Sequence, residues 1–206
     1  SLLLSKRHRH LLKGVEHSDS LTWDAHKMMF VPSLCTFLLY KDKARSFEVF
    51  SQDAPYLLAS EDPLEVDCDS ARRAIECTKR PLSVAAWALW SIYGESFIAS
   101  CIDKTIDTAR VLHGLIAESG DFMALHEPEC NIVCFRYEPS HIRGRPPEEL
   151  SAYQSEIRKR VLERGDFYIT GTRLDGIYAL RVTVMNPETG EAELKGLLNH
   201  IREIAP

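Results

Sequence analysis

The segment Ser20–Met29 contains side chains whose types and order could do chemistry. It reads Ser-Leu-Thr-Trp-Asp-Ala-His-Lys-Met-Met, so Lys27 follows a short extended run and is directly preceded by His26. A lysine held between apolar walls can lose its proton and attack a carbonyl group to form a Schiff base. The residues alone favour a plainer alternative, a solvated charge at the end of a strand, because lysine is rarely buried.

A second candidate is Arg181, which stands among apolar residues in the run 178–184. An unpaired charge is costly to bury, so this arginine needs an anionic partner. An ion pair with an acid of the core would meet that need. Arg136 has similar neighbours, and we interpret it as structural.

The overall composition is that of a globular protein, and its charge disfavours nucleic acids and membranes as partners. Of 206 residues, 45% are hydrophobic and 27% are charged, which suits one large domain or two small ones. The formal net charge is −5 and no segment is strongly basic, which disfavours nucleic acids and anionic membranes as partners. The longest apolar runs, 30–40 and 82–93, are too short to span a bilayer.

The cysteines and histidines indicate neither disulfides nor a metal site. None of the six cysteines forms a CxxC pair, and most stand in apolar runs. We therefore expect reduced thiols in a cytoplasmic protein. His8, His10 and His17 lack the spacing of metal ligands.

The first 118 residues predict helices and few strands. Residues 34–40 are apolar throughout, which predicts a strand buried on both faces, as in the middle of a larger sheet. The irregular stretch 42–79 contains scattered prolines and charges. The other expected elements are the end of a helix at 4–13 stopped by Gly14, a short extended run at 21–23, a short helix at 44–50, and strong helices at 82–93 and 96–117 interrupted by Gly94.

The remaining residues predict a compact two-layer α/β unit, and we place the domain boundary near residue 118. The order of its elements is β-β-α-β-β-α. The expected strands are 122–126, 132–137, 167–172 and 178–184, and the expected helices are 147–164, closed by Gly165, and 191–204.

Several motifs along the chain resemble the group II pyridoxal-phosphate-dependent amino-acid decarboxylases. That family includes glutamate, cysteine-sulfinate, aspartate, diaminobutyrate and aromatic amino-acid decarboxylases. Ser20–Met29 is similar to its cofactor-lysine motif, and residues 1–14 are similar to the preceding helix in the branch that acts on acidic substrates. The other similar segments are Cys77–Arg80, Trp87 with Trp90, Tyr93-Gly94, Cys134–Arg136 and Ala179–Arg181 through Asn186-Pro187.

The resemblance implies a role for five residues. Lys27 would form the Schiff base with the aldehyde of pyridoxal 5′-phosphate, and His26 would contact the cofactor phosphate. Asp24 stands where several relatives have asparagine, also near the phosphate. An aspartate there would repel the phosphate dianion unless its side chain points away. A role as a turn residue at the end of the strand is therefore an equal alternative to phosphate contact. Tyr56, in the family's catalytic loop, would protonate the substrate Cα from the neighbouring subunit, with a half-buried loop aromatic as the alternative. Arg181 would bind a substrate carboxylate.

The resemblance also implies a fold and an incomplete site. We expect an α/β fold, with residues 1–118 as the C-terminal part of a fold-type I large domain, including the catalytic loop 42–79, and residues 119–206 as a small α/β domain. The family's phosphate cradle and the aspartate paired to the pyridine nitrogen precede the segment that matches Ser1. The chain would then be the C-terminal half of a homodimeric enzyme that needs its N-terminal half.

The expected activity is decarboxylation of an amino acid, with glutamate, aspartate or cysteine sulfinate as the favoured substrates. Diaminobutyrate decarboxylation or transamination on the same scaffold is one alternative. The other is a non-catalytic module that only dimerises or folds with a partner chain.

Overall fold

The computed structural model covers residues 1–206 and describes all of them except 51–53, 55, 57, 59–61 and 77–78. The described chain forms two compact units, Ser1–Ile98 and Ala99–Pro206. Among the described residues, none of the helices is long and apolar enough to cross a membrane.

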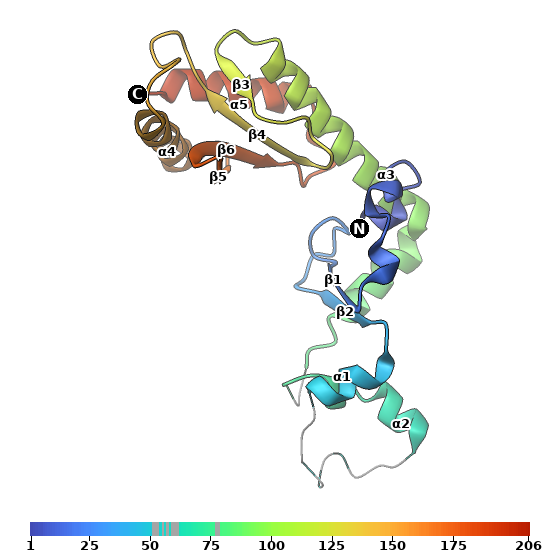
Figure 1. The fold of residues 1–206 in the computed structure, drawn as a ribbon. Coiled ribbons are helices and arrows are strands. Elements are labelled where there is room, and N and C mark those ends of the chain that lie inside the picture. Colours follow the sequence, from blue (N-terminus) through green and yellow to red (C-terminus); the bar gives the residue numbers. More distant parts are fainter. Residues whose placement is uncertain (51–53, 55, 57, 59–61, 77–78) are drawn as a thin grey trace. The chain divides into compact units, whose positions relative to one another are not determined.

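The first unit begins with tight turns and a two-stranded antiparallel sheet. Strands β1 (Ser20–Asp24) and β2 (Thr36–Tyr40) pair over their full length (Figure 1). The helix predicted over 4–13 is present only as short 3-10 helices, which are favoured over α-helix in such brief segments. Gly14, with a positive φ of 100°, separates the second of these 3-10 helices from the third. The 3-10 helices are η1 (Leu2–Leu4), η2 (Arg9–Leu12) and η3 (Val15–His17).

The prediction that residues 34–40 are buried on both faces was wrong for the described chain. β2 pairs only with β1, and Leu38 and Leu39 are exposed, as is Leu34 just before the strand. An apolar run of this kind is typical of a strand with neighbours on both sides. The apolar pattern of residues 34–40 therefore predicts more burial than the described chain provides.

The stretch between β2 and the long helix contains more helix than the sequence predicts. Helix α1 (Lys43–Val49) was expected, and the Asp42 side chain caps it by accepting from the Ala44 amide. Helix α2 (Pro63–Cys68) was not expected, because Pro63 was interpreted as a breaker. Proline is favoured at the first position of a helix, where it stands here behind the capping Asp62. A 3-10 helix, η4 (Ser70–Arg73), follows.

Helix α3 (Ser83–Ala117) consists of two helical segments separated at Gly94, as predicted. Gly94 has φ 74° and ψ 170°, a conformation that interrupts the helix and that glycine adopts without a steric penalty. The division into compact units falls inside this helix, between Ile98 and Ala99, and not near residue 118. The reason is that Leu112 and Ile116 already belong to the second core.

The second unit has the predicted β-β-α-β-β-α order. Its sheet is antiparallel, with strands in the order β3-β4-β6-β5. Asp175 and Gly176 both have positive φ between β5 and β6, as a tight hairpin turn requires. The elements are β3 (Phe122–Ala124), β4 (Ile132–Tyr137), α4 (Pro147–Arg164), β5 (Thr170–Leu174), β6 (Ile177–Thr183) and α5 (Glu191–Ile204).

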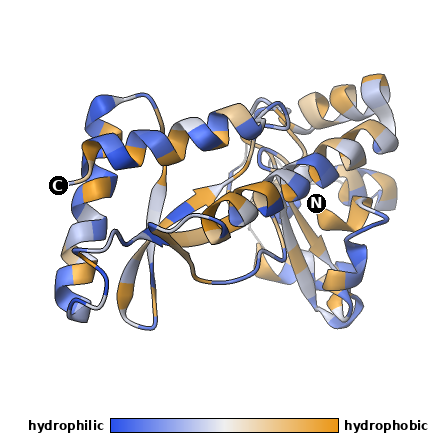
Figure 2. Ribbon diagram, turned by 90° about the horizontal axis from the view of Figure 1, so that it is seen from above, coloured by the Kyte–Doolittle hydropathy of each residue, from blue (hydrophilic) through white to orange (hydrophobic). Residues whose placement is uncertain are grey.

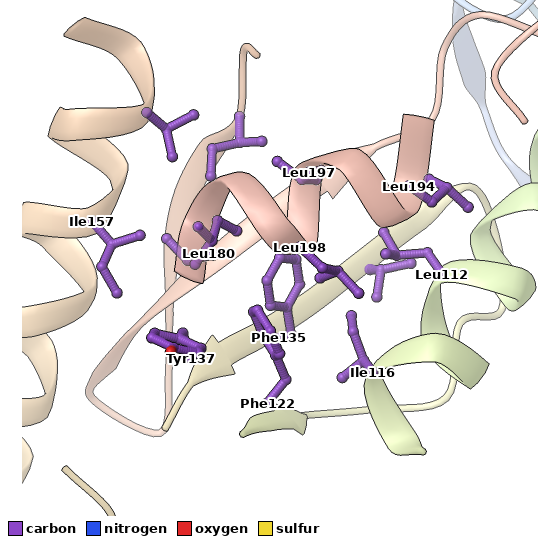
Figure 3. Packing of buried hydrophobic residues seen from close by; sticks show 14 of the residues in the cluster. Leu112, Ile116, Phe122, Phe135, Tyr137, Ile157, Leu180, Leu194, Leu197 and Leu198 are labelled. Carbon is purple, nitrogen blue, oxygen red and sulfur yellow. The ribbon is translucent and has the colours of Figure 1, made fainter. Parts of the chain in front are cut away.

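One face of this sheet packs against the helices to form the larger core. Figure 3 shows the rings of Phe122, Phe135 and Tyr137 lying together between Leu198 of α5 and Ile157 of α4. Helix α5, next to the C-terminus label in Figure 2, carries both hydrophobic and hydrophilic residues, as an amphipathic helix on a sheet should. Because side chains alternate along a strand, the residues between these core positions lie on the opposite face of the sheet.

Candidate functional site

Lys27 lies on a turn that directly follows β1. The turn is held by backbone hydrogen bonds from the Ala25 amide to the Cys35 carbonyl (2.8 Å) and from the Lys27 amide to the Asp24 carbonyl (3.2 Å). Ala25 and Met29 are buried on either side of the lysine. These two anchors fix the turn and leave Lys27 directed outward, with 60% of its side chain exposed.

The lysine amine contacts a carboxylate from the end of the same strand. Lys27 Nζ lies 2.6 Å from Asp24 Oδ2, and the other oxygen of Asp24 accepts a hydrogen bond from Thr36 Oγ1 at 2.7 Å. Hydrogen bonds from Lys27 and then from Thr36 hold the pKa of Asp24 below its usual value. Asp24 is therefore charged at neutral pH, and each of its two oxygens already has a donor.

The half-buried imidazole of His26 is fixed by the start of β2. Its Nδ1 lies 3.0 Å from the carbonyl oxygen of Cys35 and 3.3 Å from the amide nitrogen of the same residue. Within the described part of the chain, Nε2 of His26 has no hydrogen-bond partner. A ring held at one nitrogen can present the other to a ligand, so the predicted contact with a phosphate is compatible with this geometry.

Sequence reasoning missed Cys35 and Thr36, the residues that orient this turn. Cys35 contributes through its backbone, which sequence cannot show. Thr36 contributes through its hydroxyl, and it stands directly opposite Asp24 in the β1–β2 register. The predicted strands 21–23 and 34–40 could have indicated this pair if they had been read as an antiparallel hairpin.

Tyr56 is exposed, and it makes no hydrogen bond or ring contact with any other residue that the structure describes. Its neighbours Pro55 and Leu57 lie outside the described residues, and 85% of Tyr56 is accessible to solvent. This exposure does not match the alternative of a half-buried loop aromatic. Its role as proton donor stays a prediction.

Arg181 lies on β6, on the sheet face that the helices of its unit do not cover. It pairs in register with Cys134 and with Thr170 on the two flanking strands. It is half-buried, and it makes no ion pair with any residue that the structure describes. Burial raises the pKa of the Cys134 thiol, so this neighbour stays neutral and offers no anion.

Arg136, on the same face of the sheet, has its partner within the chain. Its Nε lies 2.5 Å from Glu138 Oε1, and both side chains are buried. A second nitrogen, Nη2, contacts Met123 Sδ at 3.3 Å. The interpretation of Arg136 as a structural residue is confirmed by this ion pair.

The first unit also has an exposed apolar surface beside the lysine turn. A cavity of about 480 Å³ is lined by aromatic and aliphatic side chains from β1, β2 and α3. Trp87 on α3 is largely exposed at its edge. Patches of this kind on a folded unit mark surfaces where another chain or segment packs. The lining residues include Trp23, Met29, Phe37, Leu39, Ala86, Trp87 and Trp90.

Comparison with known proteins relates most of the chain to one family. Residues 1–138 match the pyridoxal-dependent decarboxylase conserved domain. The acidic amino acid decarboxylase GADL1 of Mus musculus is 29% identical over 98% of this chain and 38% of its own length. The cysteine sulfinic acid decarboxylase of the same species is 28% identical over 98% of this chain and 42% of its own length. The chain thus spans about two fifths of these relatives.

Solved structures show the same relationship in three dimensions. The crystal structure of mouse CSAD in apo form superposes with a TM-score of 0.86 and 25% identity, over 99% of this chain and 43% of that chain. An Oryza sativa TDC with PLP and tryptamine has a TM-score of 0.85 at 20% identity and shows the shared fold. The expected α/β, fold-type I architecture is confirmed by these matches.

The family match covers the lysine turn, and the structural matches cover both units. Among the described residues, the turn after β1 carries Lys27, which follows His26 directly in the sequence. The chain therefore belongs to the pyridoxal-dependent decarboxylase family, whose cofactor is pyridoxal 5′-phosphate.

Proposed function

We propose that this chain is the lysine-bearing part of an enzyme that decarboxylates an acidic amino acid with pyridoxal 5′-phosphate. The observation that carries the proposal is the family match over residues 1–138, which includes Lys27 on an exposed turn. The relatives named above are an acidic amino acid decarboxylase and a cysteine sulfinic acid decarboxylase. Their names support an acidic substrate.

The residues of the lysine turn fit this cofactor in part. The Lys27 amine is accessible, as attack on an aldehyde requires, and the free edge of His26 suits a phosphate. Asp24 does not suit a phosphate, because both of its oxygens accept from donors of this chain and its charge would repel an anion. Lys27 and His26 would therefore hold the cofactor from this chain.

The cofactor, when bound, supplies an aldehyde for the lysine and a ring that withdraws electrons from the substrate. The chain's own residues would bind, orient and protonate. Arg181 would bind a carboxylate of the substrate, which suits a half-buried guanidinium without an ion-pair partner among the described residues. Tyr56 Oη would return a proton to the substrate Cα, acting from the neighbouring subunit of a homodimer.

The proposed partners are the N-terminal half of the same enzyme and a second subunit. Two observations support them: the relatives are longer than this chain, and the apolar cavity beside Trp87 is open. A two-stranded sheet such as β1–β2 is marginal alone, and further strands would stabilise it. The five described cysteines are free thiols, which supports a cytoplasmic location.

The test compares this chain with the full product of the gene that encodes it. Each is mixed with pyridoxal 5′-phosphate and with L-glutamate, L-aspartate or L-cysteine sulfinate, and released CO₂ is measured together with the amine. We expect equal amounts of both products from the full protein and none from the 206-residue chain. Absence of CO₂ from the full protein with all three substrates would contradict the proposed activity. Release by the chain alone would contradict the need for partners.

A further inference from the structure

Thr36 links the second strand of the first unit to the side chain of Lys27. It is the first residue of β2 and stands opposite Asp24, the last residue of β1. Its hydroxyl donates to one oxygen of Asp24 at 2.7 Å, while the other oxygen accepts from Lys27 Nζ at 2.6 Å. The three side chains therefore form one continuous series of hydrogen bonds.

We infer that Thr36 and Asp24 are positioning residues for Lys27, in which a carboxylate anchored by a hydroxyl holds the lysine amine at the end of β1. The inference rests on the proposed role of Lys27 as the cofactor lysine. A lysine has a flexible four-carbon stem and loses considerable rotamer freedom when it is held in one place. A carboxylate that is already fixed adds little further ordering cost to that of the lysine.

Threonine is suited to fixing Asp24. Its β-branched side chain is stiff about χ1, and directly opposed residues of antiparallel strands lie close enough for their side chains to interact. The register thus places the hydroxyl on the carboxylate without further adjustment. Both carboxylate oxygens of Asp24 therefore accept from donors of the chain, one from the lysine amine and one from the threonine hydroxyl.

A second lysine provides a matched comparison inside the same chain. Lys195 lies 2.6 Å from Glu191, and its side chain is 58% exposed, close to the 60% of Lys27. The carboxylates differ: Glu191 is 57% exposed, and within the described residues no second donor holds it, whereas Asp24 is 27% exposed and is bound by Thr36. A difference in reactivity between the two lysines therefore measures the effect of anchoring the carboxylate.

The experiment measures how fast individual lysines react with acetic anhydride in the full product of the gene, prepared without cofactor. An ammonium held by a carboxylate must leave it and lose its proton before it can attack. Trace acetylation is quantified by peptide mass spectrometry, and each rate is divided by the rate of the same lysine in urea. The proteins are the wild type, Thr36→Val, Thr36→Ser and Asp24→Asn, with Lys195 as the reference in the other unit and Lys43 in the same unit.

We expect Lys27 to react more slowly than Lys195 in the wild type. Thr36→Val should raise the Lys27 rate about twofold to fivefold, the range for a partly exposed ion pair, and Asp24→Asn should raise it at least as much. Thr36→Ser keeps the hydroxyl and should restore the wild-type rate, which a purely structural role of the threonine methyl group would not do. Lys43 and Lys195 should not change.

An unchanged Lys27 rate in Thr36→Val, with Lys43 also unchanged, would overturn the inference, even if Asp24→Asn is faster. A parallel rise at Lys43 would mean that Thr36→Val has unfolded the unit. In that case the comparison of Asp24→Asn with Thr36→Ser decides between the outcomes. If Lys27 reacts at the same rate in both variants, the inference is overturned. Since the assay contains no cofactor, its outcome is separate from the proposed function, which fails instead if the cofactor attaches to another lysine.

Discussion

Two arginines on one face of the C-terminal sheet should respond in opposite ways to the same substitution. Arg136 and Arg181 lie on neighbouring strands, and Arg181 pairs in register with Cys134, two residues before Arg136. Arg136 is bound to Glu138, whereas Arg181 has no ion-pair partner in the described chain. Methionine removes the charge from either position and keeps most of the length of the side chain.

The structure sets the size of each effect. The side chains of Arg136 and Glu138 are only 11% and 8% exposed, so Arg136→Met leaves a buried carboxylate without its partner. Breaking a buried pair in this way costs about 3–5 kcal/mol. For a unit of this size, 1 kcal/mol shifts Tm by roughly 4–8 °C, so Arg136→Met should lower the Tm of the second unit by roughly 10 °C or more. Arg181→Met breaks no such pair and should cost less than about 1 kcal/mol.

The assay combines thermal unfolding, followed by circular dichroism, with steady-state kinetics of the full enzyme. We expect Arg181→Met to lower kcat/KM strongly while Tm stays within a few degrees of wild type. Arg181→Lys should also lower kcat/KM, because an ammonium lacks the planar fork that binds a carboxylate at two points. A Tm loss in Arg181→Met as large as that in Arg136→Met, with kinetics unchanged, would refute the reasoning and make Arg181 a structural residue.

Three further predictions concern other residues. Tyr56→Phe should slow decarboxylation by the full enzyme about 10²–10⁴-fold, the usual contribution of a general acid, while near-wild-type turnover would remove Tyr56 from the mechanism. Gln154→Leu should lower the urea midpoint, because the buried Gln154 amide pairs with both the N–H and the C=O of Tyr137, and each unpaired group costs about 1–3 kcal/mol. The hydrogen bond from Arg202 lowers the pKa of Asp121 to about 2, so this carboxylate stabilises the fold above its unfolded pKa and loses that effect as pH falls through about 2. Because both side chains are partly exposed, we expect the ion pair to contribute about 1 kcal/mol to the free energy of unfolding. In Arg202→Met the urea midpoint should therefore fall less steeply than in the wild type as the pH is lowered. The same acid dependence in both proteins would contradict this.

The sequence predicts the second unit well because local signals there agree with the tertiary packing. Helix α4 has the bounds expected, with Pro147 in its first turn and Gly165 in a left-handed conformation at its end. Strand β4 also has its predicted bounds. Strand β5 begins later than expected, because its pairing with β6 sets its register, which the sequence does not show.

The first unit is predicted less well because its apolar pattern predicts more burial than its own described residues provide. The exposed Leu38 and Leu39 in β2 are the clearest example. At the candidate site, the position of Lys27 after a strand was predicted. Its contact with Asp24 and the anchoring of Asp24 by Thr36 depend on the pairing of β1 with β2, which two separately predicted strands do not specify.

The most direct test of the central claim is to identify the lysine that carries the cofactor. The full product of the gene is incubated with pyridoxal 5′-phosphate, reduced with borohydride, digested and mapped by mass spectrometry, with Lys27→Ala as the control. We predict a pyridoxyl group on Lys27 and its loss, together with CO₂ release, in Lys27→Ala. A pyridoxyl group on another lysine, such as Lys13 or Lys79, with activity retained in Lys27→Ala, would contradict the account.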